Sequence, residues 1–258
     1  MTTRDRGTTM MIDPGLPTGA FTDVVHSHGD YIDLVKFGWG TALVTRDIDR
    51  KIGVLRDAGI GFYFGGTLFE HYVWTGRLRD YLALVERTGA THIEVSNGTI
   101  PLDQQSKAEY VRQMSGHRPV LSEVGYKDAD RSALLTPADW VSALQEDLDA
   151  GAVTVITEAR ESGRSGIADP DGHMRDDVLH AVLDAIDPTL LMFEAPTKEL
   201  QVELVLTVGP QVNLGNVAAA DLIGLETLRR GLRGDTLLQL TTGVDPAANR
   251  ARRTPFAA

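Results

Sequence analysis

Short apolar stretches alternate along this chain with longer segments in which apolar residues recur every three or four positions. The short stretches have the length of buried parallel strands, and we predict eight of them, at residues 9–13, 31–36, 61–64, 92–95, 120–123, 153–157, 190–193 and 211–214. The longer segments predict helices, because their apolar residues share one face. Ile48, Ile52 and Leu55 form one such stripe, and Trp140 and Leu144 belong to another.

Residues suited to helix ends mark the same boundaries. Thr136 stands before a proline, and Thr197 precedes the apolar stripe of residues 198–206. A threonine in this position can accept a hydrogen bond from the free amides of a first helical turn. Gly59 and Gly89 follow predicted helices, where a glycine can turn the chain toward the next strand.

A strand and helix alternation repeated eight times is typical of a single (β/α)8 barrel, and an open doubly wound sheet is the alternative. No phosphate-loop fingerprint of the open sheets follows the first strand. Polar residues also end strands all along the chain, whereas an open sheet gathers its site at one point. We therefore expect one barrel domain over residues 1–258, with its core at about 9–240 and a flexible tail at 241–258.

Carboxylates end five of the predicted strands. They are Asp13, Glu94, Glu123, Glu158 and Glu194. Because the ends of parallel barrel strands meet at one mouth, we expect these groups to lie close together. Carboxylates so close need a cation, basic side chains or protons. Hard oxygen ligands without any cysteine favour magnesium over zinc, although any single glutamate could instead pair with a basic residue of the site.

The five lysines of the chain divide into two groups. Lys36, Lys127 and Lys198 lie at or just beyond predicted strand ends, whereas Lys51 and Lys107 fall on helical segments, where we expect them to be solvated. A lysine at a strand end could form a Schiff base, hold an anion or donate a proton. The sequence leaves these three roles open.

Other groups that could bind anions follow the sixth and eighth strands. Arg160 and Ser162 come after the sixth, and Asn213, Gly215 and Asn216 lie around the end of the eighth. Barrels often bind phosphate on backbone amides near that last strand, although the two asparagines could simply form turns.

Two glycine-containing segments near predicted strand ends are ambiguous. The segment Gly65-Gly66-Thr67 reads either as a phosphate cradle or as a tight turn into a helix. Trp39 lies in a short loop after Lys36, where it could wall the site or merely pack.

Charge and composition narrow the classes of function. A net charge of -11 argues against a nucleic-acid surface, and the absence of cysteine excludes disulfides and thiolate chemistry. The one basic cluster, at residues 250–253, is expected in a mobile terminus. No apolar run approaches the ~20 residues of a membrane span, and residues 1–9 lack a signal peptide's apolar core, so we expect no membrane partner and a cytoplasmic location. The sequence leaves open whether the chain forms a homo-oligomer.

Several of these segments together resemble the phosphosulfolactate synthase family. The most specific motifs are VKFGWGT at residues 35–41, EARESG at 158–163, and NLGN at 213–216 followed by LRRGLRGDT at 228–236. The resemblance extends from about residue 9 to residue 237. It implies a (β/α)8 barrel and a magnesium-dependent carbon–sulfur lyase that adds sulfite to phosphoenolpyruvate, giving a phosphorylated sulfonate.

The implied chemistry suggests roles for the strand-end residues. Attack on the methylene carbon of phosphoenolpyruvate creates an enolate-like dianion that needs a metal and cations, and an acid must then protonate the adjacent carbon. We expect metal ligation by Asp13, Glu94, Glu158 and Glu194. We expect substrate binding by Lys36, Arg160, Ser162, Lys198, Asn213, Gly215 and Asn216. We expect catalysis by Lys127, Lys36 and Glu123, with Lys127 as proton donor.

The chain departs from the family pattern at two positions expected near the site. Tyr126 replaces the first lysine of an EVGKKD pattern, and Asn97 replaces the aspartate of SDGTI. The loss of a cation and of an acid predicts that the nucleophile is the part of the reaction most open to change. One alternative is therefore a different nucleophile on a phosphoenolpyruvate-type substrate. Another is a non-catalytic barrel, either stress-associated or ligand-binding.

Overall fold

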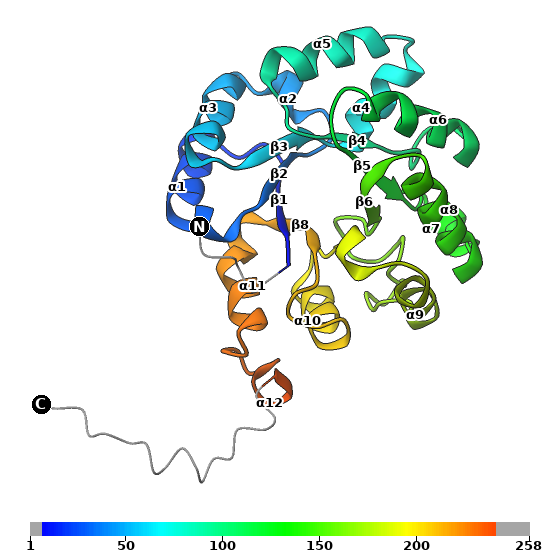
Figure 1. The fold of residues 1–258 in the computed structure, drawn as a ribbon. Coiled ribbons are helices and arrows are strands. Elements are labelled where there is room, and N and C mark those ends of the chain that lie inside the picture. Colours follow the sequence, from blue (N-terminus) through cyan, green and yellow to red (C-terminus); the bar gives the residue numbers. More distant parts are fainter. Residues whose placement is uncertain (1–6, 241–258) are drawn as a thin grey trace, which may run out of the picture.

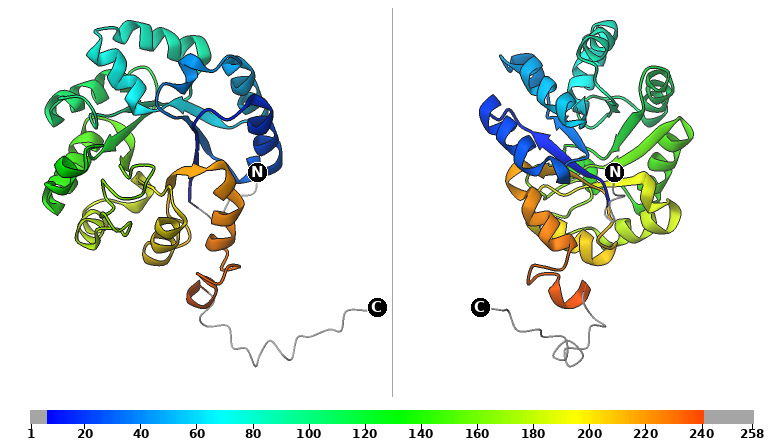
Figure 2. Two further views of the ribbon diagram at one scale, coloured as in Figure 1. Left: turned by 180° about the vertical axis from the view of Figure 1, so that it is seen from behind. Right: turned by 60° about the vertical axis from the view of Figure 1, so that its left-hand side comes forward.

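Eight parallel strands curl into a barrel with helices on the outside (Figures 1 and 2). The computed structural model describes residues 7–240, so the predicted tail at 241–258 and its basic cluster lie outside the described residues. Neighbouring strands follow the order β3-β2-β1-β8-β7-β6-β5-β4. The two end strands meet where the amide of Thr91, just before β4, donates to the carbonyl oxygen of Phe62 in β3 at 2.9 Å. The predicted single (β/α)8 barrel is confirmed.

Six strands lie within one residue of their predicted bounds, whereas β2 and β8 each begin three residues later than predicted. The strands are β1 (Thr9–Asp13), β2 (Leu34–Phe37), β3 (Gly61–Phe64), β4 (Ile93–Val95), β5 (Val120–Val124), β6 (Ala152–Thr157), β7 (Leu191–Glu194) and β8 (Leu214–Ala218). The last strand was predicted at 211–214 but begins only at Leu214. Side-chain contacts surround this start: Arg229 donates to the carbonyl oxygen of Val212 at 2.8 Å, and Asn213 Nδ2 donates to the carbonyl oxygen of Leu191 in β7 at 2.8 Å.

The helices surround the strands, as Figure 1 shows. They are α1 (Thr18–His28), α2 (Thr41–Val44), α3 (Ile48–Ala58), α4 (Gly66–Trp74), α5 (Leu78–Thr88), α6 (Gln104–Ser115), α7 (Ala129–Ala133), α8 (Pro137–Asp149), α9 (Asp176–Ala185), α10 (Lys198–Thr207), α11 (Leu222–Arg229) and α12 (Leu237–Leu240). The predicted cap is confirmed at Thr136, which forms a reciprocal capping box with Asp139. Among residues 7–240, no helix combines the length and the apolar character needed to cross a membrane.

Two apolar layers stabilise the barrel. A small cluster fills its interior, and it consists of Met10, Tyr63, Leu121, Ile156 and Met192. The larger cluster packs the outer faces of the strands against the helices. Successive side chains of a strand point to opposite layers, so one residue's direction fixes that of its neighbour.

Two lysines of the helices are buried in the outer layer, between the strands and the helices. Lys51 of α3 lies 2.5 Å from Asp13, and Lys107 of α6 lies 2.7 Å from Asp147; all four side chains are at most 1% exposed. The prediction that both lysines are solvated was wrong. Lys51 is three residues after Ile48 and four before Leu55, so it belongs to the buried stripe of its helix.

The buried pair predicts a large loss of stability when one partner is removed. Replacing Lys51 with methionine should lower the free energy of unfolding by about 3–5 kcal/mol, because the Asp13 carboxylate then stays buried without a counter-charge. Urea denaturation measures the change. The double variant Asp13→Asn/Lys51→Met should recover much of the loss. A single-variant loss below about 1 kcal/mol, as for exposed pairs, would contradict this account.

Candidate active site

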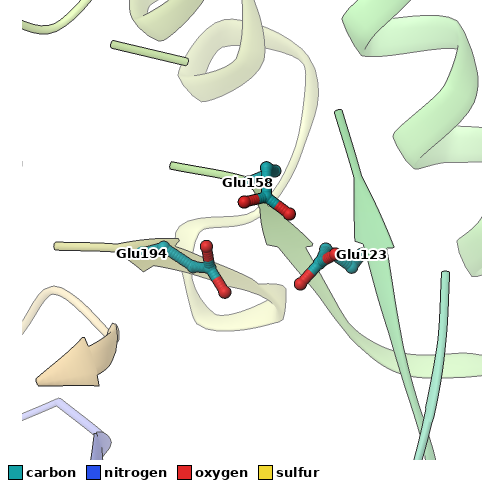
Figure 3. A group of neighbouring side chains, drawn as sticks. All are labelled: Glu123, Glu158 and Glu194. Atoms are coloured by element: carbon teal, nitrogen blue, oxygen red, sulfur yellow. The ribbon is translucent and has the colours of Figure 1, made fainter. Parts of the chain in front are cut away.

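Four buried glutamates meet at the carboxyl-terminal mouth of the barrel. Glu94 lies in β4, Glu123 in β5 and Glu194 in β7, and Glu158 directly follows β6. Figure 3 shows the side chains of Glu123, Glu158 and Glu194 converging from three neighbouring strands. One oxygen from each of these three lies within 4.8 Å of the others, a spacing at which they could hold a metal ion.

Two lysines connect these carboxylates. Lys36, at the end of β2, places its Nζ atom 3.1 Å from Glu94, 3.2 Å from Glu123 and 3.0 Å from Glu194. Lys127, in the loop after β5, lies 3.1 Å from Glu123 and 2.7 Å from Glu158. Lys36 is therefore enclosed by the cluster, whereas Lys127, with 24% of its side chain exposed, is open to the mouth.

Burial and mutual repulsion shift the pKa values of these groups in different directions. Burial raises the pKa of Glu194 to about 7, and burial with the neighbouring Glu123 raises the pKa of Glu158 well above its usual range. Burial alone would also raise the pKa of Glu123, but Lys127 and Lys36 outweigh it and hold that pKa well below its usual range. When all are ionised, four carboxylates against two ammonium groups leave two negative charges, which a divalent cation could balance.

Backbone amides fix two of the glutamates. Glu194 accepts a hydrogen bond from the amide of Ala159 at 3.0 Å, and Glu94 accepts one from the amide of Gly66, the first residue of α4. A Cβ atom on Gly66 would lie 2.7 Å from the Glu94 carboxylate, so glycine is needed for this close approach. The amide of Gly66 thus binds a side chain of the protein itself. Of the two readings of the Gly65-Gly66-Thr67 segment, the tight turn fits this contact.

A second polar network supports Glu123 from behind. Lys107 donates to the backbone carbonyl oxygen of Glu123 at 2.6 Å and to Asp147 at 2.7 Å. Ser122 donates to the same Asp147 carboxylate at 2.8 Å. This network, between β5 and the helices α6 and α8, anchors the end of the strand from which Glu123 reaches into the cluster.

The cluster lines a cavity of about 140 Å³. The cavity walls include most of the predicted site residues together with groups from the surrounding loops. They are Ile12, Lys36, Trp39, Gly65, Gly66, Thr67, Glu94, Lys127, Glu158, Arg160, Glu161, Glu194 and Asn216. Trp39 thus walls the site, which was one of its two possible roles. Arg160 is exposed, and it donates to the backbone carbonyl oxygen of Lys127 at 3.1 Å.

Asp13, a predicted metal ligand, lies outside this cluster. Its carboxylate pairs with Lys51 and accepts hydrogen bonds from the amides of Gly15 and Leu16 at 2.9 and 2.7 Å. The preceding residue, Ile12, lines the cavity, so strand alternation directs Asp13 toward the helices. The expectation that every strand-end carboxylate shares the mouth must be corrected for this residue.

Two predicted substrate-binding residues are displaced because β8 begins late. Asn213 precedes the strand, at the end of the barrel opposite the mouth, where its side chain bonds the backbones of Thr8 and Leu191. Gly215 faces the barrel interior, where a Cβ atom would lie 2.9 Å from Met10. Only Asn216 of the three residues predicted here reaches the cavity.

Two further predicted residues lie apart from the cavity walls. Ser162 is exposed in the loop after β6. Lys198, at the start of α10, forms an ion pair with Asp235 at 2.9 Å. Neither side chain takes part in the glutamate cluster.

Tyr63, which no sequence pattern singled out, lies in the barrel interior beside the cluster. It is fully buried, and its hydroxyl has no hydrogen-bond partner among the described residues. Burial and the nearby Glu94 carboxylate raise its pKa well above the usual value, so it stays a neutral phenol. In the β2–β3 register it lies opposite Lys36, and paired residues of adjacent strands face the same side, so it shares the barrel interior with that lysine.

Comparison with known proteins agrees with this geometry. The sequence profile of (2R)-phospho-3-sulfolactate synthase matches residues 2–235. The chain belongs to the phosphosulfolactate synthase family. It is 44% identical over 234 residues to a phosphosulfolactate synthase of Bacillus subtilis (strain 168), covering 90% of this chain and 93% of that protein. It is 41% identical over 235 residues to one from Methanocaldococcus jannaschii, covering 90% and 94%. The names of these relatives support an enzyme.

Solved structures show the same fold at much lower identity. A 3-hexulose-6-phosphate synthase aligns with a TM-score of 0.57 and 15% identity, covering 87% of this chain and 98% of its own. A phosphonopyruvate hydrolase aligns with a TM-score of 0.52 and 14% identity, covering 96% and 87%. At this identity the likeness concerns the barrel alone.

The two departures from the phosphosulfolactate synthase pattern lie outside the glutamate cavity. Asn97 donates to the carbonyl oxygen of Leu102 at 3.0 Å, and the ring of Tyr126 lies 3.9 Å beneath the Arg131 guanidinium. Both residues line a separate cavity of about 280 Å³ beside α8. Neither side chain lines the glutamate cavity, but both residues lie next to its wall, because the amide of Lys127 donates to the carbonyl oxygen of Gly98 at 3.1 Å.

The positions of Asp13 and Glu194 predict which carboxylate matters for metal binding. If the cluster holds a divalent cation, replacing Glu194 with glutamine should weaken the binding of that cation at least about tenfold, because a charged oxygen donor of the cluster is lost. The matched control, Asp13→Asn, should leave the affinity of the folded protein unchanged. Isothermal titration calorimetry measures both. The reverse order of effects would show that the metal binds elsewhere.

Proposed function

We propose that this protein is a phosphosulfolactate synthase that adds sulfite to phosphoenolpyruvate with magnesium as cofactor. Family membership supports this reaction. The structural observation that supports it most is that Lys36 and Lys127 pair with a larger number of buried glutamates at one small cavity. Such a site offers cations for anionic substrates and spare carboxylates for a metal.

Magnesium fits the donor set. Glu123, Glu158 and Glu194 offer only hard carboxylate oxygens, and the cluster carries two negative charges beyond its lysines when fully ionised. We therefore assign the metal to these three residues. Relative to the predicted set, Glu123 replaces Asp13, and Glu94 is left out because it pairs with Lys36 and the amide of Gly66. A bound magnesium ion would stabilise the negative charge that develops on the substrate carboxylate.

The two lysines supply the remaining charges. Burial would lower the pKa of Lys127, but Glu123 and Glu158 raise it above its ordinary value, so the side chain stays protonated as a proton donor requires. In the proposed reaction a sulfite lone pair forms the C–S bond at the methylene carbon, and the double-bond electrons move toward the carboxylate. Lys127 then protonates the carbon that bears the phosphate. Lys36 and the exposed Arg160 would hold anionic oxygens.

Two arguments count against the alternatives. A different nucleophile was suggested by Asn97 and Tyr126, and neither side chain lines the cavity. A non-catalytic barrel would have no need to keep several mutually repelling carboxylates buried together, since each costs free energy to desolvate.

The direct test is a reaction of the purified protein with phosphoenolpyruvate, sulfite and Mg²⁺. A new phosphorus-31 resonance should appear from a phosphate ester on a saturated carbon, and removal of the metal with EDTA should prevent its formation. A folded protein that forms no such product would refute the sulfite reaction.

Variants of the two adjacent residues Lys127 and Tyr126, measured in the same assay, test whether Lys127 is the proton donor. Lys127→Gln should lower kcat by roughly 10²–10⁴-fold, the usual contribution of a general acid. The matched variant Tyr126→Lys should stay within about threefold of the parent, because Tyr126 faces away from the cavity. Equal losses in both variants would contradict the assignment of Lys127.

A further inference from the structure

Two residues that line the cavity have unusual backbone conformations. Trp39 has a φ of 50° and Asn216 a φ of 52°, and within residues 7–240 these are the non-glycine residues with positive φ. A side chain with a Cβ atom disfavours this region, and such strain persists where the surrounding structure imposes it, often at functional sites. Both strained positions lie on the walls of the same cavity.

A β-bulge accounts for the position of Asn216. In the pairing of β1 with β8, Thr9 is opposite Leu214 but Met11 is opposite Val217, so Gly215 and Asn216 together face one residue of β1. A bulge of this kind inserts one residue and redirects a side chain. Regular alternation after the inward-facing Gly215 would have directed Asn216 toward the helices, whereas the bulge places it on the cavity wall.

The side-chain amide of Asn216 lacks a partner for its oxygen. The residue is 8% exposed, and its Oδ1 atom is buried without a hydrogen-bond partner among the described residues. Its backbone amide finds only the sulfur of Met10, at 3.5 Å. A buried polar atom without a partner costs free energy, and a bound molecule that forms a hydrogen bond with this amide would offset that cost.

The side chains that line the cavity indicate which chemical group of a bound molecule would contact Asn216. The other polar side chains of the cavity are mostly charged, whereas Asn216 offers a neutral amide. Rotation of the amide by half a turn exchanges its oxygen with an NH₂ group, so the same position can present a donor. A neutral donor can bind an anionic oxygen without weakening the attraction of the glutamates for a cation.

We propose that Asn216 is a substrate-binding residue whose side-chain NH₂ group donates a hydrogen bond to an anionic oxygen of the bound substrate. The inference rests on the proposed function, which supplies two candidate anions, phosphoenolpyruvate and sulfite. The strained backbone and the bulge are the means by which the fold delivers this amide to the cavity.

Two substitutions separate binding from strain. Asn216→Gly removes the amide and relieves the positive φ, so the melting temperature should stay equal or rise. The KM for the anion that accepts the hydrogen bond should nevertheless increase about 10- to 100-fold, the range for a lost hydrogen bond to a charged group. Asn216→Asp keeps the shape but adds a negative acceptor, and it should raise the same KM further.

The control is the other asparagine of the segment. Asn213→Ala removes the hydrogen bonds at the opposite end of the barrel, so it should lower the melting temperature and leave both KM values unchanged. An increase confined to phosphoenolpyruvate assigns the accepted oxygen to that substrate, and an increase confined to sulfite assigns it to sulfite. Unchanged KM values in Asn216→Gly, or tighter binding in Asn216→Asp, would overturn the proposal.

Calorimetric titration of phosphoenolpyruvate in the presence of Mg²⁺ measures substrate binding without turnover. It therefore tests the role of Asn216 independently of the proposed reaction. If the parent protein turns over substrate and the Asn216 variants match it, only the role of Asn216 fails. If the parent binds phosphoenolpyruvate without turnover, the proposed reaction fails, and weaker binding by the variants still supports the role of Asn216. If the parent neither binds nor converts phosphoenolpyruvate, both proposals fail.

Discussion

The ammonium group of Lys36 is the contact on which the site depends. It lies within 3.2 Å of carboxylates from β4, β5 and β7, so it joins strands on both sides of the barrel mouth. Burial would lower its pKa, but the three carboxylates, Glu194 first, raise it well above the ordinary value. Lys36 therefore stays charged inside the protein and allows the glutamates to approach one another.

Lys36 alone does not balance the negative charge of the glutamates, and the remaining negative charge determines what the site can bind. Lys127 neutralises a second charge at the mouth, but the four glutamates still outnumber the two lysines. The raised pKa values of Glu158 and Glu194 express the same excess. A cluster that must take up protons or a cation is suited to bind a metal together with anionic substrates.

Polar residues at strand ends made much of this site predictable. The sequence located Lys36 and the four glutamates because a barrel gathers the ends of its strands at one mouth. It misplaced Asp13, because the direction of a side chain depends on strand alternation and Ile12 already faces the cavity. Lys51 and Lys107 were misjudged because a lysine within an apolar stripe can be buried when the adjacent layer supplies a carboxylate.

The environment of Asn216 could not be predicted from local patterns. Arg229, from α11, binds the backbone just before β8, and the bulge lies in the pairing of β8 with β1. Both are long-range interactions that leave no periodic signal in the sequence. The motif NLGN indicated the correct family. Of the three residues of this motif that were expected to bind substrate, only Asn216 lines the cavity.

The most direct measurement of the central claim is a crystal structure of the protein soaked with Mn²⁺, a hard cation visible by its anomalous scattering. The excess negative charge at the mouth predicts one strong peak bound by oxygens of Glu123, Glu158 and Glu194, at about 2.0–2.6 Å as for other hard cations. A Mn²⁺ peak bound to other carboxylates would contradict this claim. So would Mn²⁺ peaks on the protein surface with no peak at these three glutamates.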